Sequence, residues 1–144
     1  MRPRLVPELI CSDLFASLQF YVGLLGFRVL YARPEERFTF LERDGAELML
    51  EQPLTHDRLW PEAELAKPFG RGVNFEIKVS DIDELHAAVI AGGNECFLPL
   101  EERWYRRDDM EIGVRQFAVQ DPDGYLIRLS QSIGNRRLAS SKKC

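Results

Sequence analysis

The sequence predicts an α+β fold of two tandem βαβββ modules, and three observations support this prediction. A strand, a helix and three further strands are indicated twice, in the same order, along the chain. Both predicted helices begin at a Ser-Asp pair, Ser12-Asp13 and Ser80-Asp81, at the same offset behind a strand. The last hairpin of each copy turns on Asp-Gly, at Asp44-Gly45 and at Asp123-Gly124. A chain of 144 residues suits one domain made of two such modules, so we treat 1–144 as one domain.

The first module is expected over residues 5–52. Its first strand spans 6–10, and the helix that follows carries apolar residues at helical spacing until Gly26 ends it. Three short apolar segments then read as strands. These strands are expected at 27–31, 37–42 and 46–52.

The second module is expected over residues 71–132. Residues 73–79 alternate apolar and polar side chains, as in a strand with one buried face. Ser80 and Asp83 have the spacing of a capping box at the start of the helix, and Gly92-Gly93 ends it. Further strands are expected at 95–98, 114–120 and 125–131. The last two are joined by Asp121-Pro122-Asp123-Gly124, in which Pro122 presets one backbone angle and Gly124 accepts a positive φ.

Two long segments interrupt the pattern. The connector at residues 53–70 contains His56, Trp60 and Phe69, and a second predicted loop at 99–113 contains Trp104 and Tyr105. Loops of this length inside a compact domain are usually functional or disordered, and we expect their aromatic residues to be pocket walls. Residues 133–144 read as a polar tail.

Composition limits the class of partner. Hydrophobic residues make up 45% and charged residues 29% of the chain, and 19 basic against 23 acidic residues give a net charge of -4. This charge disfavours nucleic acid and favours a cationic ligand. No apolar run suits a bilayer or a signal peptide, so we expect no membrane partner. Three cysteines at no metal spacing predict reduced thiols and a cytoplasmic location.

The doubled module and its motifs resemble the vicinal-oxygen-chelate superfamily, which includes glyoxalase I, extradiol dioxygenases, fosfomycin-resistance enzymes and bleomycin-resistance proteins. The resemblance covers about Val6 to Gln131. It implies that each module curls its sheet into half of a cup-shaped site, often completed across a dimer. The residues that carry it are Ser12, Asp13, Leu14, Ser17, Phe20, Tyr21, Leu25, Gly26, Phe27, Asp121, Pro122, Asp123, Gly124, Leu126 and Ile127.

The metal enzymes of that superfamily place four ligands on inward-facing positions, typically His or Gln, Glu, His and Glu. The matching positions in this sequence are Val6, Met49, Asn74 and Arg128. None supplies the imidazole or carboxylate that a divalent cation prefers, so we expect no metal, no cofactor and no catalytic residue. Neither histidine pairs with a carboxylate in a recognisable acid-base pattern.

Strand alternation places several charged residues beside these four positions. Glu8, Glu47, Glu51, Glu76 and Lys78 are expected on the same inward faces. Two readings of Arg128 stay open: it pairs internally with Glu76 or Glu47, or it contacts a ligand. The surplus of carboxylates, together with aromatic walls, favours a cationic aromatic ligand.

Several short strings are similar to the bleomycin-resistance branch, whose members lack the metal, dimerise and sequester a cationic aromatic antibiotic. They are Pro7-Glu8-Leu9, Glu47-Leu48-Met49-Leu50-Glu51, Arg115-Gln116-Phe117-Ala118 and Arg128-Leu129-Ser130-Gln131. This resemblance implies a metal-free, homodimeric binding protein for a small molecule, associated with antibiotic resistance. The candidate ligand-binding residues are Glu8, Phe38, Met49, Glu51, Trp60, Asn74, Glu76, Trp104, Tyr105, Arg115, Phe117 and Arg128.

Two alternatives accompany this prediction. The first is a lyase, isomerase or dioxygenase of the same superfamily that uses Glu51 or His56 with an unforeseen metal geometry. The second is a binder of an anionic metabolite held by Arg128 and Arg115. Treatment with a chelator distinguishes the metal-dependent enzyme from the two binding proteins. The charge of the ligand distinguishes the binder of an anion from the binder of a cation.

Overall fold

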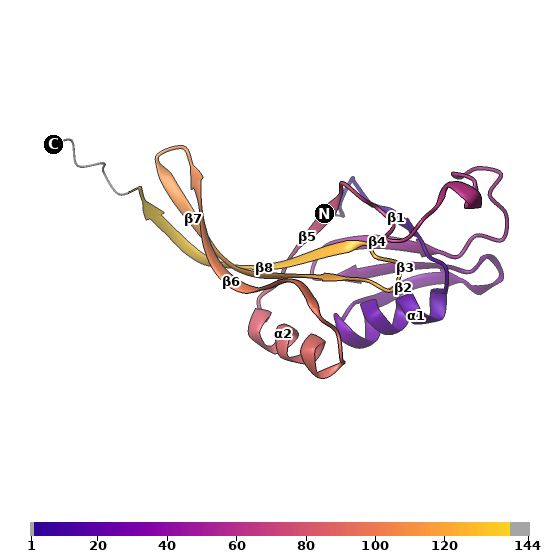
Figure 1. The fold of residues 1–144 in the computed structure, drawn as a ribbon, viewed down its shortest axis with the longest axis horizontal. Helices are drawn as coiled ribbons and strands as arrows, with labels where there is room; N and C mark the ends of the chain where they lie inside the picture. Colours follow the sequence, from indigo (N-terminus) through magenta and orange to yellow (C-terminus); the bar gives the residue numbers. More distant parts are fainter. Residues whose placement is uncertain (1, 139–144) are drawn as a thin grey trace.

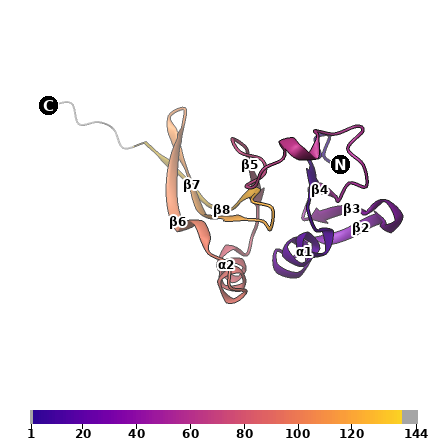
Figure 2. The ribbon, with the colours of Figure 1, turned by 45° about the vertical axis from the view of Figure 1, so that its right-hand side comes forward.

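A computed structural model describes residues 2–138 and confirms the two tandem modules. Each module forms one open four-stranded sheet, with strand order β1-β4-β3-β2 in the first and β5-β8-β7-β6 in the second. In both, the first strand runs parallel to the last and the remaining pairs are antiparallel. The modules lie side by side, each with its helix beneath its sheet (Figures 1 and 2). The predicted end of the tail at 139–144, with Cys144, lies outside the described residues.

The first module follows the predicted order with small shifts at its ends. A π-helical turn, η1 (Gln19–Leu24), continues helix α1. A short 3-10 turn, η2 (Pro34–Glu36), precedes the hairpin of β3 and β4, and another, η3 (Glu62–Glu64), follows it. Asp13 caps α1, because its carboxylate accepts the backbone N–H groups of Phe15 and Ala16. The main elements are β1 Glu8–Ile10, α1 Leu14–Leu18, β2 Arg28–Arg33, β3 Phe38–Arg43 and β4 Ala46–Glu51.

The second module differs from its prediction at the helix start. Ser80 and Asp83 do not form a capping box; the N–H of Ile82 instead donates to Oε1 of Gln131 at 2.9 Å. The carboxylate of Asp81, the residue before the helix, accepts hydrogen bonds from Arg43 of the first module. Its elements are β5 Asn74–Lys78, α2 Ile82–Ala91, β6 Cys96–Arg107, β7 Met110–Gln120 and β8 Leu126–Arg137.

The predicted loop at 99–113 is not a loop. It is the far half of a long β6–β7 hairpin, which with the end of β8 projects as a three-stranded arm from the body (Figure 1). Asp108 has a positive φ of 57° and forms the tip of this hairpin. The segment 133–137, predicted as part of a polar tail, is the arm's third strand.

The hydrophobic core fills the space between the sheets and the helices. Alternate strand residues face the helices and are almost fully buried. Each such side chain stabilises the fold by about 2 kcal/mol. These residues are Leu9, Leu41, Leu48 and Leu50 in the first sheet and Ile77, Phe117, Ile127 and Leu129 in the second.

The Asp-Pro-Asp-Gly turn joins the two modules. The carboxylate of Asp123, 1% exposed, accepts the backbone N–H and the hydroxyl of Ser12 at 3.0 and 2.6 Å. Asp121 accepts the hydroxyl of Tyr21 at 2.8 Å, and burial raises the pKa of its carboxyl despite that bond. Gly124 has the predicted positive φ, 95°. This turn therefore connects the start of the first helix to the last strand of the second module.

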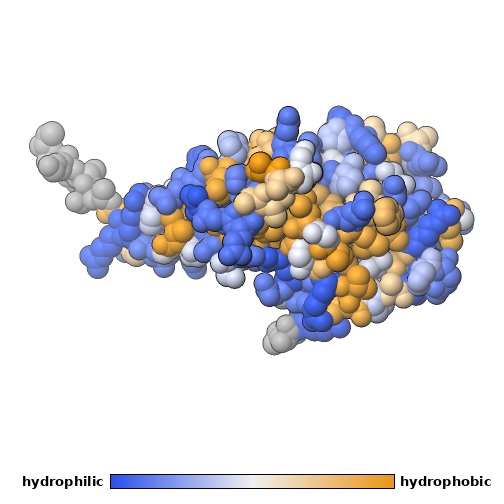
Figure 3. Space-filling model, turned by 90° about the horizontal axis from the view of Figure 1, so that it is seen from below, coloured by the Kyte–Doolittle hydropathy of each residue, from blue (hydrophilic) through white to orange (hydrophobic). Residues whose placement is uncertain are grey.

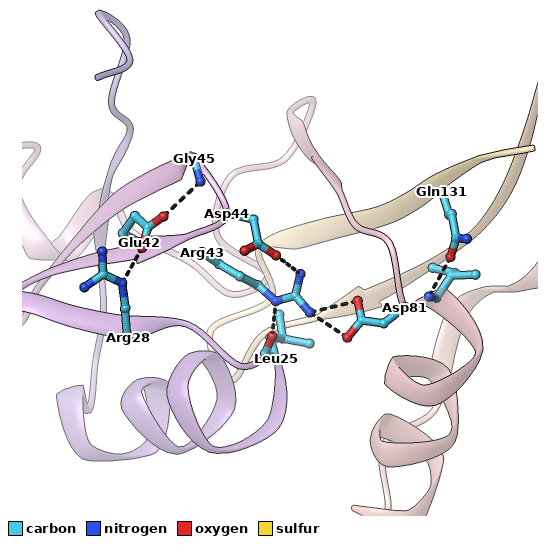
Figure 4. A network of polar contacts seen from close by, with 9 residues as sticks. Leu25, Arg28, Glu42, Arg43, Asp44, Gly45, Asp81 and Gln131 are labelled. Carbon is cyan, nitrogen blue, oxygen red and sulfur yellow. Dashed lines mark hydrogen bonds and ion pairs between the residues drawn. The ribbon is translucent and has the colours of Figure 1, made fainter. Parts of the chain in front are cut away.

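An ion pair forms a second connection between the modules (Figure 4). Arg43 donates from Nη2 to both carboxylate oxygens of Asp81 at 2.9 Å and from Nε to the carbonyl of Leu25 at 2.7 Å. The Arg43 side chain is 10% exposed and the Asp81 side chain 38% exposed, so water reaches the carboxylate side of this pair.

The helix-bearing side has apolar areas between charged ones (Figure 3). Phe15 in α1 and Ile90 in α2 are 70% and 48% exposed. Among residues 2–138, no helix has both the length and the apolar character that a membrane crossing requires.

Candidate functional site

The candidate site lies on the sheet faces that carry no helix, here called the open faces. In the second module, the register places Ala118 opposite Arg128 and Gln116 opposite Ser130, so these residues share one face. Glu76 lies opposite Arg128 on the parallel strand β5. The open face is thus built from β5, β8 and β7, with β6 at its border.

Arg128 is the centre of a polar network on this face. It donates from Nη2 to Oε2 of Glu76 at 2.7 Å and from Nη1 to Oε1 of Gln116 at 2.9 Å. A longer contact of 3.4 Å joins its Nε to Oδ1 of Asn74. The arginine is therefore paired internally, with Glu76 and not with Glu47.

The network continues beyond Arg128. Gln116, 1% exposed, donates from Nε2 to the hydroxyl of Tyr105 at 2.8 Å and to Oε1 of Glu101 at 3.0 Å. Lys78 binds the second oxygen of Glu76 at 2.9 Å. The ammonium of Lys78, and then the charge of Arg128, hold the pKa of Glu76 below its usual value. The two cations balance Glu76 and Glu101, so this face has little net charge.

A hollow of about 440 Å³ lies over this network. Tyr105 and Ile112 contribute from the arm, so the hollow depends on the part of the hairpin predicted as a loop. Its lining combines a phenol and two aliphatic side chains with charged groups. The lining residues are Asn74, Glu76, Lys78, Tyr105, Ile112, Val114 and Arg128.

The open face of the first module is acidic and aromatic. Glu8 and Phe40 lie opposite Met49, and Phe38 lies opposite Glu51. A hydrogen bond shared with Glu51, together with partial burial and the charge of Glu51, raises the pKa of Glu8 to about 7. Neither carboxyl group forms an ion pair within residues 2–138.

Aromatic rings border these two carboxyl groups. Tyr31 stacks on Phe40 with ring centroids 5.1 Å apart and lies 6.0 Å from Phe38. The guanidinium of Arg33 lies 3.9 Å from the ring centroid of Phe38. The face therefore already holds a cation over an aromatic ring within the chain itself.

Four predicted site residues lie elsewhere. Trp104 points to the opposite side of the arm from Tyr105, over Gly113 and beneath the guanidinium of Arg136 at 3.9 Å. Arg115 faces the helix side and pairs with Asp83 at 2.8 Å.

Phe117 is fully buried in the core beside His86, and Trp60, 72% exposed, lies on the connector. The structure brings the other eight candidates to the two open faces. These are Glu8, Phe38, Met49, Glu51, Asn74, Glu76, Tyr105 and Arg128.

Sequence reasoning missed Gln116, Glu101, Tyr31 and Phe40. Gln116 was detectable in principle, because a buried amide within an apolar strand must have polar partners. The other three depend on strand register, which the sequence alone leaves open.

The four positions matched to metal ligands do not suit a divalent cation. Val6 has no donor atom, Met49 offers a thioether, and Asn74 faces the guanidinium of Arg128. Arg128 brings a positive charge to the fourth position. Across residues 2–138, no group of three or more His, Cys, Asp or Glu side chains is arranged to hold a metal ion.

Comparison with known proteins agrees with the fold. The family model of the glyoxalase/bleomycin resistance protein/dioxygenase superfamily matches residues 5–129. A superfamily member from Vibrio splendidus 12B01 is 40% identical over 90% of this chain and 98% of its own, with a TM-score of 0.42. No curated protein is significantly similar in sequence.

Two further solved structures share the fold at lower identity. TioX from Micromonospora sp. ML1 is 22% identical, with 91% of this chain and 100% of its own covered and a TM-score of 0.67. Lactoylglutathione lyase from Agrobacterium tumefaciens is 19% identical, with 90% and 94% covered and a TM-score of 0.58. Proteins with different names thus share this architecture, so the site must decide the function.

Proposed function

The chain belongs to the glyoxalase/bleomycin resistance protein/dioxygenase superfamily, and from this premise we propose that it is a metal-independent binding protein. Its ligand is a cationic aromatic antibiotic such as bleomycin, or a similar molecule. The protein acts by stoichiometric sequestration, so its affinity and concentration determine its effect. The observation that carries this proposal is the internally paired Arg128 at the fourth metal-ligand position.

The pairing of Arg128 argues for binding without a metal. A divalent cation at this position would meet a guanidinium that Glu76 and Gln116 hold in place. Moving Arg128 away would leave the carboxylate of Glu76 with Lys78 alone. The residues present therefore favour organic recognition over metal chemistry.

The charge of the first module's open face argues for a cationic ligand. Glu8 and Glu51 form no ion pair within residues 2–138, and Tyr31 beside them is 46% exposed. A flat cation gains from both the carboxylates and the ring faces. Glu76 already neutralises the charge of Arg128, which disfavours the alternative of an anionic metabolite at that position.

The remaining features of the proposal follow from the family. We expect a homodimer in the cytoplasm, with the ligand held between the open faces of two copies, and a role in antibiotic resistance. The alternative of a metal-dependent lyase, isomerase or dioxygenase using Glu51 or His56 needs further ligands beside them, and within residues 2–138 no group of three or more His, Cys, Asp or Glu side chains is arranged to hold a metal ion.

The raised pKa of Glu8 predicts that cation binding tightens as pH rises. Below its pKa of about 7 Glu8 is mostly neutral, and above it Glu8 adds a negative charge to this face. Ethidium is a suitable probe, because its quaternary nitrogen keeps its charge at every pH. We expect fluorescence titrations to show several-fold tighter binding at pH 8 than at pH 6.

The matched variants for this test are Glu8→Gln and Glu35→Gln. Glu8→Gln should remove the pH dependence, whereas Glu35→Gln, on the exposed turn η2, should keep it. The same Glu8→Gln change should make stability less sensitive to pH. A pKa raised above the unfolded value of 4.5 means that the fold loses stability as pH rises from there through 7. An unchanged pH profile in Glu8→Gln would refute this role of the pair.

A further inference from the structure

A second hollow, of about 380 Å³, lies between the 53–70 connector and the end of the first sheet. Figure 1 shows this connector beside the turn that joins β2 to β3. None of the eight candidates on the open faces lines it, so it is separate from the proposed cation site. Its lining is Ile10, Cys11, Ser12, Arg37, Gln52, Pro53, Leu54, His56, Glu62, Leu65 and Phe69.

Arg37 supplies the cation of this hollow. Its backbone is fixed on both sides: its N–H donates to the carbonyl of Pro34, and its carbonyl accepts the N–H of Gln52, both at 3.0 Å. The side chain forms no hydrogen bond or ion pair with residues 2–138, although Glu62 lines the same hollow. The guanidinium therefore has its full set of donors available for an acid group.

His56 adds a second polar group. Its Nδ1 lies 2.9 Å from the carbonyl oxygen of Trp60, which only accepts, so Nδ1 carries a proton. Nε2 is left for a ligand, as an acceptor in the neutral ring and as a donor in the charged ring. Leu54, Leu65 and Phe69 provide the apolar part of the lining.

We propose that this hollow binds a small organic anion, in which Arg37 holds the carboxylate or sulfonate and the connector covers an apolar body. His56 can donate to the acid group from Nε2 when its ring is charged, and Glu62 opposes the anion by charge. This ligand is opposite in charge to the one proposed for the open faces. The two sites therefore differ in ligand class as well as in place.

A pair of probes with the same rings tests this proposal. 1-Anilinonaphthalene-8-sulfonate carries the acid group, and N-phenyl-1-naphthylamine lacks it. Fluorescence titration should show that Arg37→Gln weakens binding of the sulfonate about tenfold and leaves binding of the neutral probe unchanged. Glu62→Gln should tighten sulfonate binding, because it removes the opposing charge.

The matched control is Arg71→Gln. Arg71 is an exposed arginine close to the connector, donates to the carbonyl of Lys67 and does not line the hollow. The Arg71→Gln variant should bind both probes as the wild type does, and melting curves should confirm that all variants fold. Unchanged sulfonate binding in Arg37→Gln would overturn the proposal, as would an equal loss for both probes or an equal loss in Arg71→Gln.

Discussion

Replacing Asp123 by alanine is expected to lower the free energy of unfolding by about 3 kcal/mol. The carboxylate of Asp123, which is 1% exposed, accepts the backbone N–H and the hydroxyl of Ser12. Its loss removes both hydrogen-bond acceptors of Ser12, leaves a cavity at a fully buried position and loosens the junction of the two modules. Urea unfolding followed by circular dichroism measures the change.

Ser12→Ala and Asp57→Ala make this test specific. Ser12→Ala removes only the hydroxyl bond, so it should lower the free energy of unfolding by less than Asp123→Ala does. The double variant should lose less than the sum of the two single variants, because both remove the same bond. Asp57 is exposed on the connector, so Asp57→Ala should stay within about 0.5 kcal/mol of the wild type. Wild-type stability in Asp123→Ala would show that the turn does not join the modules.

Arg128→Ala is expected to destabilise the fold by about 2 kcal/mol and to weaken ligand binding. The change leaves the oxygens of Glu76 and Gln116 without their guanidinium donors. Because the Arg128 side chain is 28% exposed, water replaces part of the lost interaction, and the expected decrease in stability is smaller than for a fully buried pair. Urea unfolding and calorimetric titration measure the two effects.

Arg115→Ala is the matched control for this variant. Arg115 lies on the opposite face of the same sheet, and its pair with the exposed Asp83 is a surface pair. Its loss should change stability by less than about 1 kcal/mol and leave binding unchanged. Adding Glu76→Gln to Arg128→Ala should recover part of the stability, because it removes the unpaired charge. If Arg128→Ala behaves like Arg115→Ala, the network around Arg128 has no structural role.

The sequence was sufficient for the doubled module because the signals that repeat are local. Asp13 caps the first helix by accepting N–H groups two and three residues later, and Gly124 supplies the positive φ of the last turn, so both signals act on neighbouring residues. The arm was missed for the opposite reason. Residues 101–109 are charged on both faces because both faces meet water, so the alternation that identifies a half-buried strand is absent.

The site was predicted only in part, because it depends on which alternate residues of each strand face the open side, here called the phase of the strand. In β7, Phe117 and Ala118 are both buried and Arg115 and Gln116 are both polar, so the sequence fits either phase. Pairing of Ala118 with Arg128 fixes the phase and turns Gln116, not Phe117, to the open face. The same rule separates Tyr105 from Trp104, because neighbouring strand residues face opposite sides.

Calorimetric titration of the chelator-treated protein with metal-free bleomycin tests the central proposal most directly, with Tyr105→Ala and Trp104→Ala as a matched pair. We predict saturable binding at micromolar affinity or tighter, unchanged when zinc, nickel or manganese is added to the protein. Tyr105→Ala should weaken it, because Tyr105 lines the hollow over Arg128, and Trp104→Ala should not. Absence of binding until a divalent metal is restored would contradict the account and favour a metal-dependent enzyme.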